Sequence, residues 1–144
     1  MVDMTSEPIT DQLLATIFRD TKTIAVVGVS ANADRASNYV MKFLLDKGYD
    51  CVGVNPGLAG QSIHGVPVFA SLAAVDRPID MVDIFRASDA VAGIVDEALA
   101  LVPRPRVIWM QLGVIDETAA AKARAEGLTV VMDRCPKIEL SRLA

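Results

Sequence analysis

The most constraining feature of this sequence is an apolar, mostly β-branched run over residues 24–27 that stops at Gly28. Such a run is typical of a strand buried on both faces of a parallel sheet. Gly28 predicts a sharp turn, where the backbone can come close to whatever lies at the strand tip. A helical pattern follows over residues 37–46, so its first N–H groups would face the same point. A strand, a glycine turn and a helix N-terminus together predict a phosphate or nucleotide site.

Strands and helices alternate along the rest of the chain. The patterns predict strands at 23–28, 50–54, 66–69, 79–85, 106–110 and 128–132. They predict helices at 11–19 after Thr10, at 37–46, at 72–75 after Ser71, at 89–101 after Ser88, and from Asp116 and Glu117 to Gly127. Pro67 restricts its strand to an edge, and a short helical turn at most is expected after residue 132. We expect an α/β fold: a three-layer, Rossmann-like, doubly wound parallel sheet in the order 3-2-1-4-5-6.

Length and charge narrow the class of protein. The 144 residues predict a single domain over 1–144, with 1–9 as a flexible N-terminus. No apolar run approaches the ~20 residues of a membrane span. The acidic start does not resemble a signal peptide, so a cytoplasmic protein is expected. A net charge of −4 argues against a nucleic-acid surface but allows a local anion site.

Few residues offer nucleophilic or metal chemistry. The two cysteines, Cys51 and Cys135, are too few for a disulfide framework or a zinc site, so no metal is expected. Cys51 is expected to pack in a strand as a small apolar residue. His64 is the only histidine and is expected to be a solvated loop residue, so triads and histidine metal centres are disfavoured.

The predicted strand order brings distant segments to one edge, because the carboxyl ends of parallel strands share it. The candidate ligand-binding residues there are Gly28, Val29, Ser30, Arg35, Asn55, Pro56, Phe85, Arg86 and Gln111. Arg35 and Arg86 suit phosphate through bidentate hydrogen bonds, and Phe85 could stack on a base or pack against a pantetheine arm. The alternative is that both arginines are ordinary surface cations and Phe85 closes the core. A valine at position 28 is predicted to block the approach of the phosphate and to leave most of the core intact.

The Gly28 turn departs from the dinucleotide-binding pattern G-x-G-x-x-G. In that register, Ser30 and Ala33 occupy the second and third glycine positions. Asn55 ends the second strand where an NAD site places an acid for the ribose hydroxyl. A P-loop is also excluded, because no G-K-[ST] follows Gly28.

Five motifs give a resemblance that covers residues 10–144. They are Gly28-Val-Ser30, Val54-Asn55-Pro56, Asp83-Ile-Phe85-Arg86, Trp109-Met-Gln111-Leu-Gly113-Val and Met132-Asp-Arg-Cys135-Pro. With this spacing the chain resembles the small stand-alone CoA-binding proteins of bacteria and archaea. These are similar to the N-terminal CoA-binding domain of the succinyl-CoA ligase α subunit.

The resemblance implies a Rossmann-like fold with CoA across the strand tips. The phosphates would lie near Gly28, Val29, Ser30 and Arg35, and the adenosine beside Asn55 and Pro56. Phe85, Arg86 and Gln111 would line the path of the diphosphate and pantetheine.

Ligase activity is not implied for this chain. The ligase carries its phosphorylated histidine in a second domain, and His64 does not match that position. Leu58 also replaces a lysine that the ligase places after its second strand. The prediction is therefore a non-catalytic protein that binds, senses or carries coenzyme A or acyl-CoA.

Three alternatives remain open. One is a thiol or thioester enzyme that uses Cys135, which is expected to lie remote from the pantetheine end. Another is an NAD(P)-binding oxidoreductase, and the third is a partner-binding module with empty strand tips. A protein partner and a homo-oligomer are both compatible with the sequence.

Overall fold

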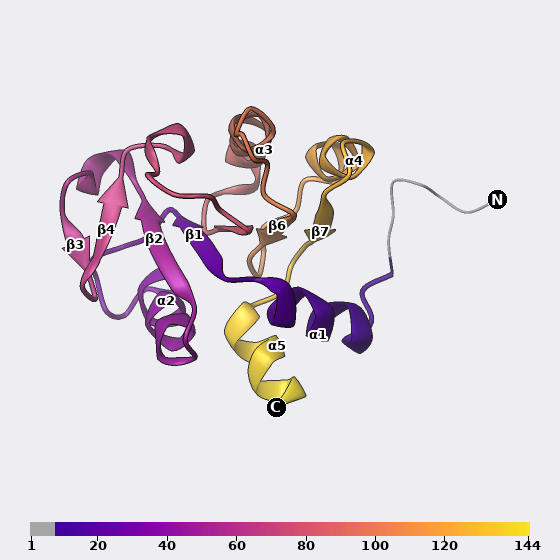
Figure 1. Cartoon of the computed structure of the whole chain (residues 1–144), viewed down its shortest axis with the longest axis horizontal. Helices are drawn as coiled ribbons and strands as arrows, with labels where there is room; N and C mark the ends of the chain where they lie inside the picture. The colour runs from indigo at the N-terminus through magenta and orange to yellow at the C-terminus, as the bar shows by residue number, and fades with distance from the viewer. Residues whose placement is uncertain (1–7) are drawn as a thin grey trace.

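A seven-stranded, mainly parallel sheet runs through the middle of the computed structural model, which describes residues 8–144 (Figure 1). The strands are β1 (Thr23–Val27), β2 (Asp50–Val54), β3 (Ser62–Ile63), β4 (Val66–Phe69), β5 (Met81–Ile84), β6 (Val107–Met110) and β7 (Thr129–Val131). Their order is β3-β4-β2-β1-β5-β6-β7. The six predicted strands therefore stand in the predicted order, and the doubly wound, Rossmann-like fold is confirmed.

The structure adds one strand that the sequence pattern did not predict. β3 pairs antiparallel with β4, with Ile63 opposite Val66, so β3 and not β4 forms this edge of the sheet. The edge position predicted for β4 from Pro67 is wrong. A two-residue strand is too short to give a periodic pattern. β3 forms because the chain turns back at once and pairs it with β4 in a hairpin.

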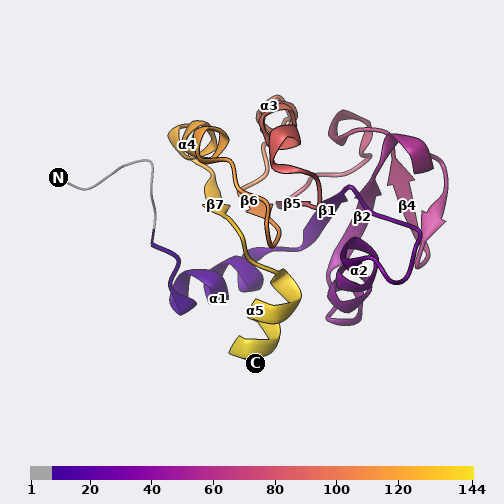
Figure 2. The ribbon, with the colours of Figure 1, turned by 180° about the vertical axis from the view of Figure 1, so that it is seen from behind.

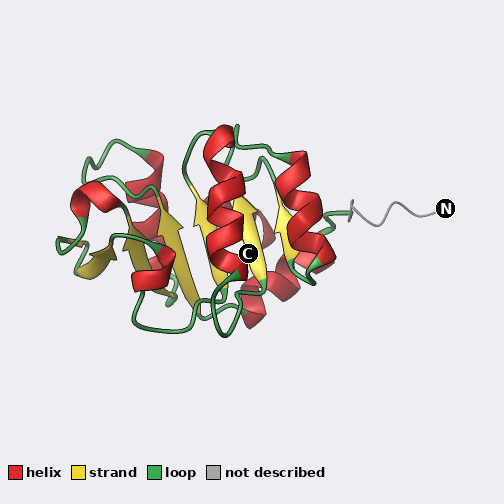
Figure 3. Ribbon diagram, turned by 90° about the horizontal axis from the view of Figure 1, so that it is seen from above, coloured by secondary structure: helices red, strands yellow, loops and turns green. Residues whose placement is uncertain are grey.

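Helices cover both faces of the sheet, as Figures 1 and 2 show from opposite sides. One face carries α1 (Asp11–Asp20), α2 (Ala36–Asp46) and α5 (Pro136–Leu143), and the other carries α3 (Val91–Leu99) and α4 (Glu117–Ala125). Figure 3 shows the strands lying side by side between these layers. Short 3-10 turns, η1 (Pro56–Leu58), η2 (Leu72–Ala74) and η3 (Ser88–Ala90), connect the elements. None of the helices in residues 8–144 has the length and apolar character to cross a membrane.

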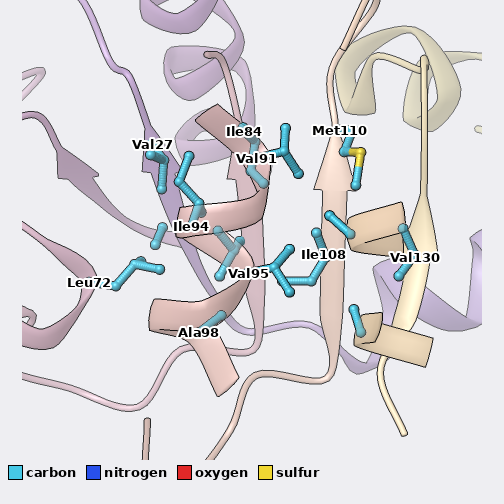
Figure 4. Packing of buried hydrophobic residues seen from close by; sticks show 14 of the residues in the cluster. Val27, Leu72, Ile84, Val91, Ile94, Val95, Ala98, Ile108, Met110 and Val130 are labelled. Carbon is cyan, nitrogen blue, oxygen red and sulfur yellow. The ribbon is translucent and has the colours of Figure 1, made fainter. Parts of the chain in front are cut away.

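Each face of the sheet has its own apolar core. Beneath α3 and α4, Ile94 and Val95 pack with Ile108 of β6 (Figure 4). The opposite core includes Trp109, which is fully buried, with its ring centroid 5.5 Å from that of Phe18 of α1. The Trp109 indole N–H donates a 2.7 Å hydrogen bond to the carbonyl of Arg134, and thus holds the chain between β7 and α5.

The predicted helix starts are partly confirmed. Thr10 caps α1 by accepting a 3.1 Å hydrogen bond from the Leu13 N–H, and Asp116 caps α4 from Ala119 at 2.9 Å. Ser71 is the N-cap residue of η2, as predicted, but its side chain accepts no hydrogen bond there; the capping predicted for Ser88 is wrong, because Ala87 and Ala90 occupy the N-cap positions of η3 and α3. The Ser88 hydroxyl instead accepts from the Ile115 N–H at 3.0 Å, in the loop after β6.

The C-terminal prediction of at most a short helical turn is also wrong, since α5 forms eight helical residues. Glu139 of α5 is buried and pairs with Arg134 and Arg142, and Arg142 also reaches Asp11 of α1. These contacts stabilise a segment whose own sequence has a weak helical pattern. At the other end, residues 1–7 of the segment predicted to be flexible lie outside the described residues, and Ile9 is partly buried against the core.

Candidate functional site

The Gly28 turn brings the ends of three strands together. Its N–H donates a 2.8 Å hydrogen bond to the Val54 carbonyl at the end of β2, and its φ of +88° favours glycine. A Cβ at this position would overlap the Phe85 carbonyl and lie 2.9 Å from the Arg86 Cδ. Gly28→Val, predicted to leave most of the core intact, would therefore also displace the backbone after β5, which is its close neighbour.

Side chains from two other elements hold the loop that follows Gly28. Ser37 of α2 accepts a 3.0 Å hydrogen bond from the Ser30 N–H, and the Asn38 amide donates to the Ser30 carbonyl at 2.8 Å. The Asn55 amide donates to the Val29 carbonyl at 2.9 Å, and its oxygen accepts from the Gly57 N–H at 2.9 Å. Asn55, predicted to contact a ligand, thus holds the loop with its amide N–H and caps η1 with its oxygen.

His64 joins this arrangement from the β3–β4 hairpin. Its Nε2 lies 2.7 Å from the Asn38 Oδ1, the oxygen of the same amide that donates to Ser30. Because an amide oxygen only accepts, Nε2 carries the proton in this contact. His64 is exposed, as predicted, but it is tied to the loop and is not simply solvated.

The N-terminus of α2 completes the setting for an anion. Arg35 is the N-cap residue, no side chain caps this end, and the first turn contains no acid. The first N–H groups of a helix carry partial positive charge and attract anions when no side chain satisfies them. The helix therefore offers free backbone donors beside the Gly28 turn.

A cavity of about 630 Å³, here called the loop cavity, lies at this point. It is lined by Gly28, Val29, Ser30, Ala31, Asn32, Arg35, Ala36, Ser37, Asn55, Gly57, Leu58 and Phe85. Six of the nine predicted ligand-binding residues are among them. Pro56 is not, because it opens η1 and faces away as an exposed residue.

A second cavity of about 870 Å³, here called the α5 cavity, adjoins the first. It is lined by Ala36, Tyr39, Val40, Phe85, Arg86, Gln111, Leu112, Val114, Cys135, Lys137, Ile138, Ser141 and Arg142. Ala36 and Phe85 line both cavities, so the two form one extended crevice across the strand tips. The remaining predicted residues, Arg86 and Gln111, lie in this second part.

The crevice is cationic in an acidic protein. None of the acidic residues among 8–144 lines either cavity, although the chain carries a net charge of −4. Within the described part of the chain, the side chains of Arg35 and Arg86 form neither an ion pair nor a hydrogen bond, whereas Arg77, Arg104 and Arg142 each have a carboxylate partner. Two guanidinium groups without a partner are therefore available to an anionic ligand.

The walls of the α5 cavity combine apolar side chains with a few polar groups. Tyr39, Leu112 and Ile138 are about half exposed at its rim, and the Lys137 Nζ lies 5.2 Å from the centre of the Tyr39 ring. Gln111 is only 6% exposed, and its Oε1 is buried with no hydrogen-bond partner in the described structure. A buried amide oxygen without a donor is costly, so a ligand N–H would be favoured here.

Cys135, expected to lie remote from the pantetheine end, lines the same cavity as Phe85, Arg86 and Gln111. The strand order puts the end of β7 beyond β6, but the chain then returns to begin α5 beside Gln111. The sequence did not indicate this return, because the helix that causes it was not predicted.

The sequence reasoning also missed Ser37 and Asn38 as residues that build the site. Both are buried polar residues on the inner face of α2, next to the apolar stripe that includes Val40 and Met41. Polar residues on the buried face of a predicted helix are a usable indication, since such groups need partners.

Asp83 on β5 is a further buried polar residue near the crevice, two positions before Phe85. It is fully buried, and neither carboxyl oxygen has a hydrogen-bond partner among residues 8–144. Burial without a counter-charge raises the pKa of Asp83 well above its ordinary value. The group is therefore favoured in its neutral form inside the sheet.

A doubly wound parallel sheet with a glycine turn and a cationic crevice at the strand tips defines a Rossmann-like ligand-binding protein. Residues 22–141 match the model of the CoA binding domain family. The chain therefore belongs to the CoA binding domain family.

The chain is also similar to relatives of known sequence or structure. The chain is 39% identical over 122 residues to the uncharacterized protein YneT of Bacillus subtilis, covering 85% of this chain and 87% of YneT. A solved Thermus thermophilus structure is 36% identical with a TM-score of 0.86, covering 94% of this chain and all of that one. Acetyl-coenzyme A synthetase 1 of Ca. Korarchaeum cryptofilum, at 20% identity, shares the fold over 76% of this chain and 25% of its own, with a TM-score of 0.63.

Proposed function

We propose that the chain binds coenzyme A or acyl-CoA in the crevice formed by the loop and α5 cavities. The observation that carries the proposal is the crevice itself: two adjoining cavities, lined by no described acid, with two arginine side chains that have no partner among residues 8–144. Membership of the CoA binding domain family supports the same ligand.

The chemistry of the two cavities matches the two halves of CoA. The loop cavity offers backbone donors at the start of α2, together with Arg35, for the phosphates, and Gly28 lets them approach without a side chain in the way. The α5 cavity offers apolar walls for the pantetheine arm and the Gln111 Oε1 for one of its amide N–H groups. Phe85 lies where the two halves would join.

An NAD(P) site fits less well. The end of β2 carries Asn55, and its amide and oxygen are already engaged by Val29 and Gly57. The residue that would hold the ribose hydroxyls is thus a neutral side chain in place of an acid, and it already uses one N–H and its oxygen within the protein. No second glycine follows Gly28 in the loop to admit a dinucleotide pyrophosphate.

We propose a binding, sensing or carrier role without catalysis. Within the crevice, Ser37 and Asn55 position the loop, Arg142 is paired with Glu139 and Asp11, and the Arg35 and Arg86 side chains are available to a ligand. The Cys135 thiol is the nucleophile that lines the α5 cavity, and its chemistry is considered separately below.

The test is calorimetric titration of the purified protein, kept reduced, with CoA, acetyl-CoA, NAD and NADP. We expect saturable one-to-one binding of the CoA compounds and no measurable heat from the two dinucleotides. Thermal unfolding checks the result, because a ligand at a hundred times its Kd adds ~2.7 kcal/mol to the free energy of unfolding. Binding of NAD or NADP alone, or of none of the four, would overturn the proposal.

A further inference from the structure

The α5 cavity contains the one thiol that faces the crevice in the described structure. Cys135 is 6% exposed, is not in a disulfide, and lies at the N-cap of α5. The other cysteine, Cys51, is fully buried in β2 and lines neither cavity. Burial raises the pKa of the Cys51 thiol to about 12, which keeps it in the unreactive thiol form.

Gln111 gives independent evidence that a ligand occupies the space beside Cys135. It lines the same cavity, it is more than nine-tenths buried, and its Oε1 has no hydrogen-bond partner among the described residues. Native proteins leave few buried acceptors unpaired, so this amide oxygen points to a ligand that brings an N–H donor. The pantetheine arm has two amide N–H groups on the way to its terminal thiol.

We propose that Cys135 is a covalent attachment site for the CoA thiol, formed by thiol–disulfide exchange with a disulfide of CoA. The proposal rests on the function proposed above, because CoA must first occupy the crevice. With the phosphates at the Gly28 turn, the pantetheine arm would extend past Phe85 into the α5 cavity. Its sulfur end would then lie on the side of the cavity that Cys135 lines.

The exchange balances without an added oxidant. The Cys135 thiol loses its proton, and its sulfur attacks the CoA sulfur of a disulfide, CoA–S–S–R. A bond forms between Cys135 Sγ and the CoA sulfur while the S–S bond of CoA–S–S–R breaks, and R–S⁻ leaves as a thiolate that takes up a proton. A free thiol such as glutathione reverses the step and releases CoA. The protein would hold CoA covalently when CoA disulfides accumulate, and reversibly when thiols are in excess.

Intact-protein mass spectrometry after incubation with CoA disulfide tests the proposal. We expect the mass to increase by one CoA less two hydrogen atoms, and dithiothreitol to remove the increment. Peptide mapping without reduction should place it on Cys135, a result that needs no variant. The Cys135→Ala protein should gain nothing, and the matched Cys51→Ala protein should react like the parent chain.

The rate of the reaction with CoA disulfide distinguishes a specific CoA site from ordinary thiol reactivity. The reaction with CoA disulfide should saturate with concentration and exceed that with glutathione disulfide by at least about tenfold, since prior binding raises the local concentration of the disulfide. A CoA analogue without the thiol should slow it by competition. Equal, non-saturating rates for the two disulfides, modification of Cys51, or no adduct would each overturn the proposal.

Calorimetric titration of the reduced Cys135→Ala protein with CoA tests the CoA-binding function separately from covalent attachment at Cys135. If CoA binds there but the parent chain forms no adduct with CoA disulfide, the attachment site is wrong and the binding function stands. If CoA does not bind the reduced parent chain either, both proposals fail.

Discussion

At the scale of single residues, the two arginines without partners are the most informative side chains. Arg86 follows β5 at the rim of the α5 cavity and is exposed, so its charge is solvated in the free protein. Arg35 occupies the corresponding position beside the loop cavity, at the start of α2. A surface arginine that serves stability usually has a carboxylate nearby, as Arg104 does with Glu126 at 3.1 Å.

Arg86→Ala is expected to weaken CoA binding by about 1.5–3 kcal/mol, or roughly 10- to 150-fold in Kd, because it removes a charge-assisted hydrogen bond. The free energy of unfolding should change little, since Arg86 has no partner to lose in the described structure. Calorimetric titration and urea unfolding measure the two quantities. Arg104→Ala is the matched control and should leave Kd unchanged; an equal loss in both variants would contradict a role for Arg86.

At the scale of elements, the position of α5 decides the shape of the crevice. This helix supplies Lys137, Ile138 and Ser141 to the α5 cavity, and Cys135 lies at its N-cap. It is held by Glu139, whose carboxylate lies 2.8 Å from Arg134 Nη1 and 3.2 Å from Arg142 Nη2. The second arginine extends the network to α1.

Glu139→Gln is expected to lower the free energy of unfolding by about 1–3 kcal/mol, because it removes the charge shared by two ion pairs at a buried position. Amide exchange in α5 should accelerate more than exchange in β1 or β5. Asp96→Asn removes an exposed ion pair with Lys122 and should cost no more than about 1 kcal/mol. Equal effects of the two substitutions would show that the Glu139 network does not hold α5.

At the scale of the whole molecule, Asp83 couples global stability to pH. The unfolded chain holds this carboxyl at its ordinary pKa of 3.8, and burial raises the folded-state pKa well above that value. Between the two pKa values the folded protein keeps a proton that the unfolded chain has released. The free energy of unfolding therefore falls as pH rises through this window, and the stabilisation is fully present only below pH 3.8.

One retained proton gives a slope of at most ~1.4 kcal/mol per pH unit. Asp83→Asn removes the titrating group, so its unfolding free energy should depend less on pH than that of the parent chain. Urea unfolding followed by fluorescence of Trp109, the only tryptophan, measures both proteins across the range. Parallel pH profiles would contradict the assignment to Asp83.

The sequence by itself determined the sheet and one half of the crevice. The apolar run before Gly28 and the alternation of strands and helices are local patterns, and the rules of parallel connections convert them into the strand order observed. Gly28, Val29, Ser30 and Arg35 follow one another closely in the chain, so the loop cavity could be predicted from one segment.

Only the tertiary structure decided the other half of the crevice, which is the α5 cavity. α5 has a weak pattern of its own, and it is tied to α1 because Arg142 reaches Asp11, a contact that no local window contains. Cys135 reaches the crevice because that helix returns to the tip of β6, and Asn55 becomes a loop-holding residue because Val29 lies beside it in space. Pairing between distant residues decides these features, and a sequence pattern records only what lies within a few residues.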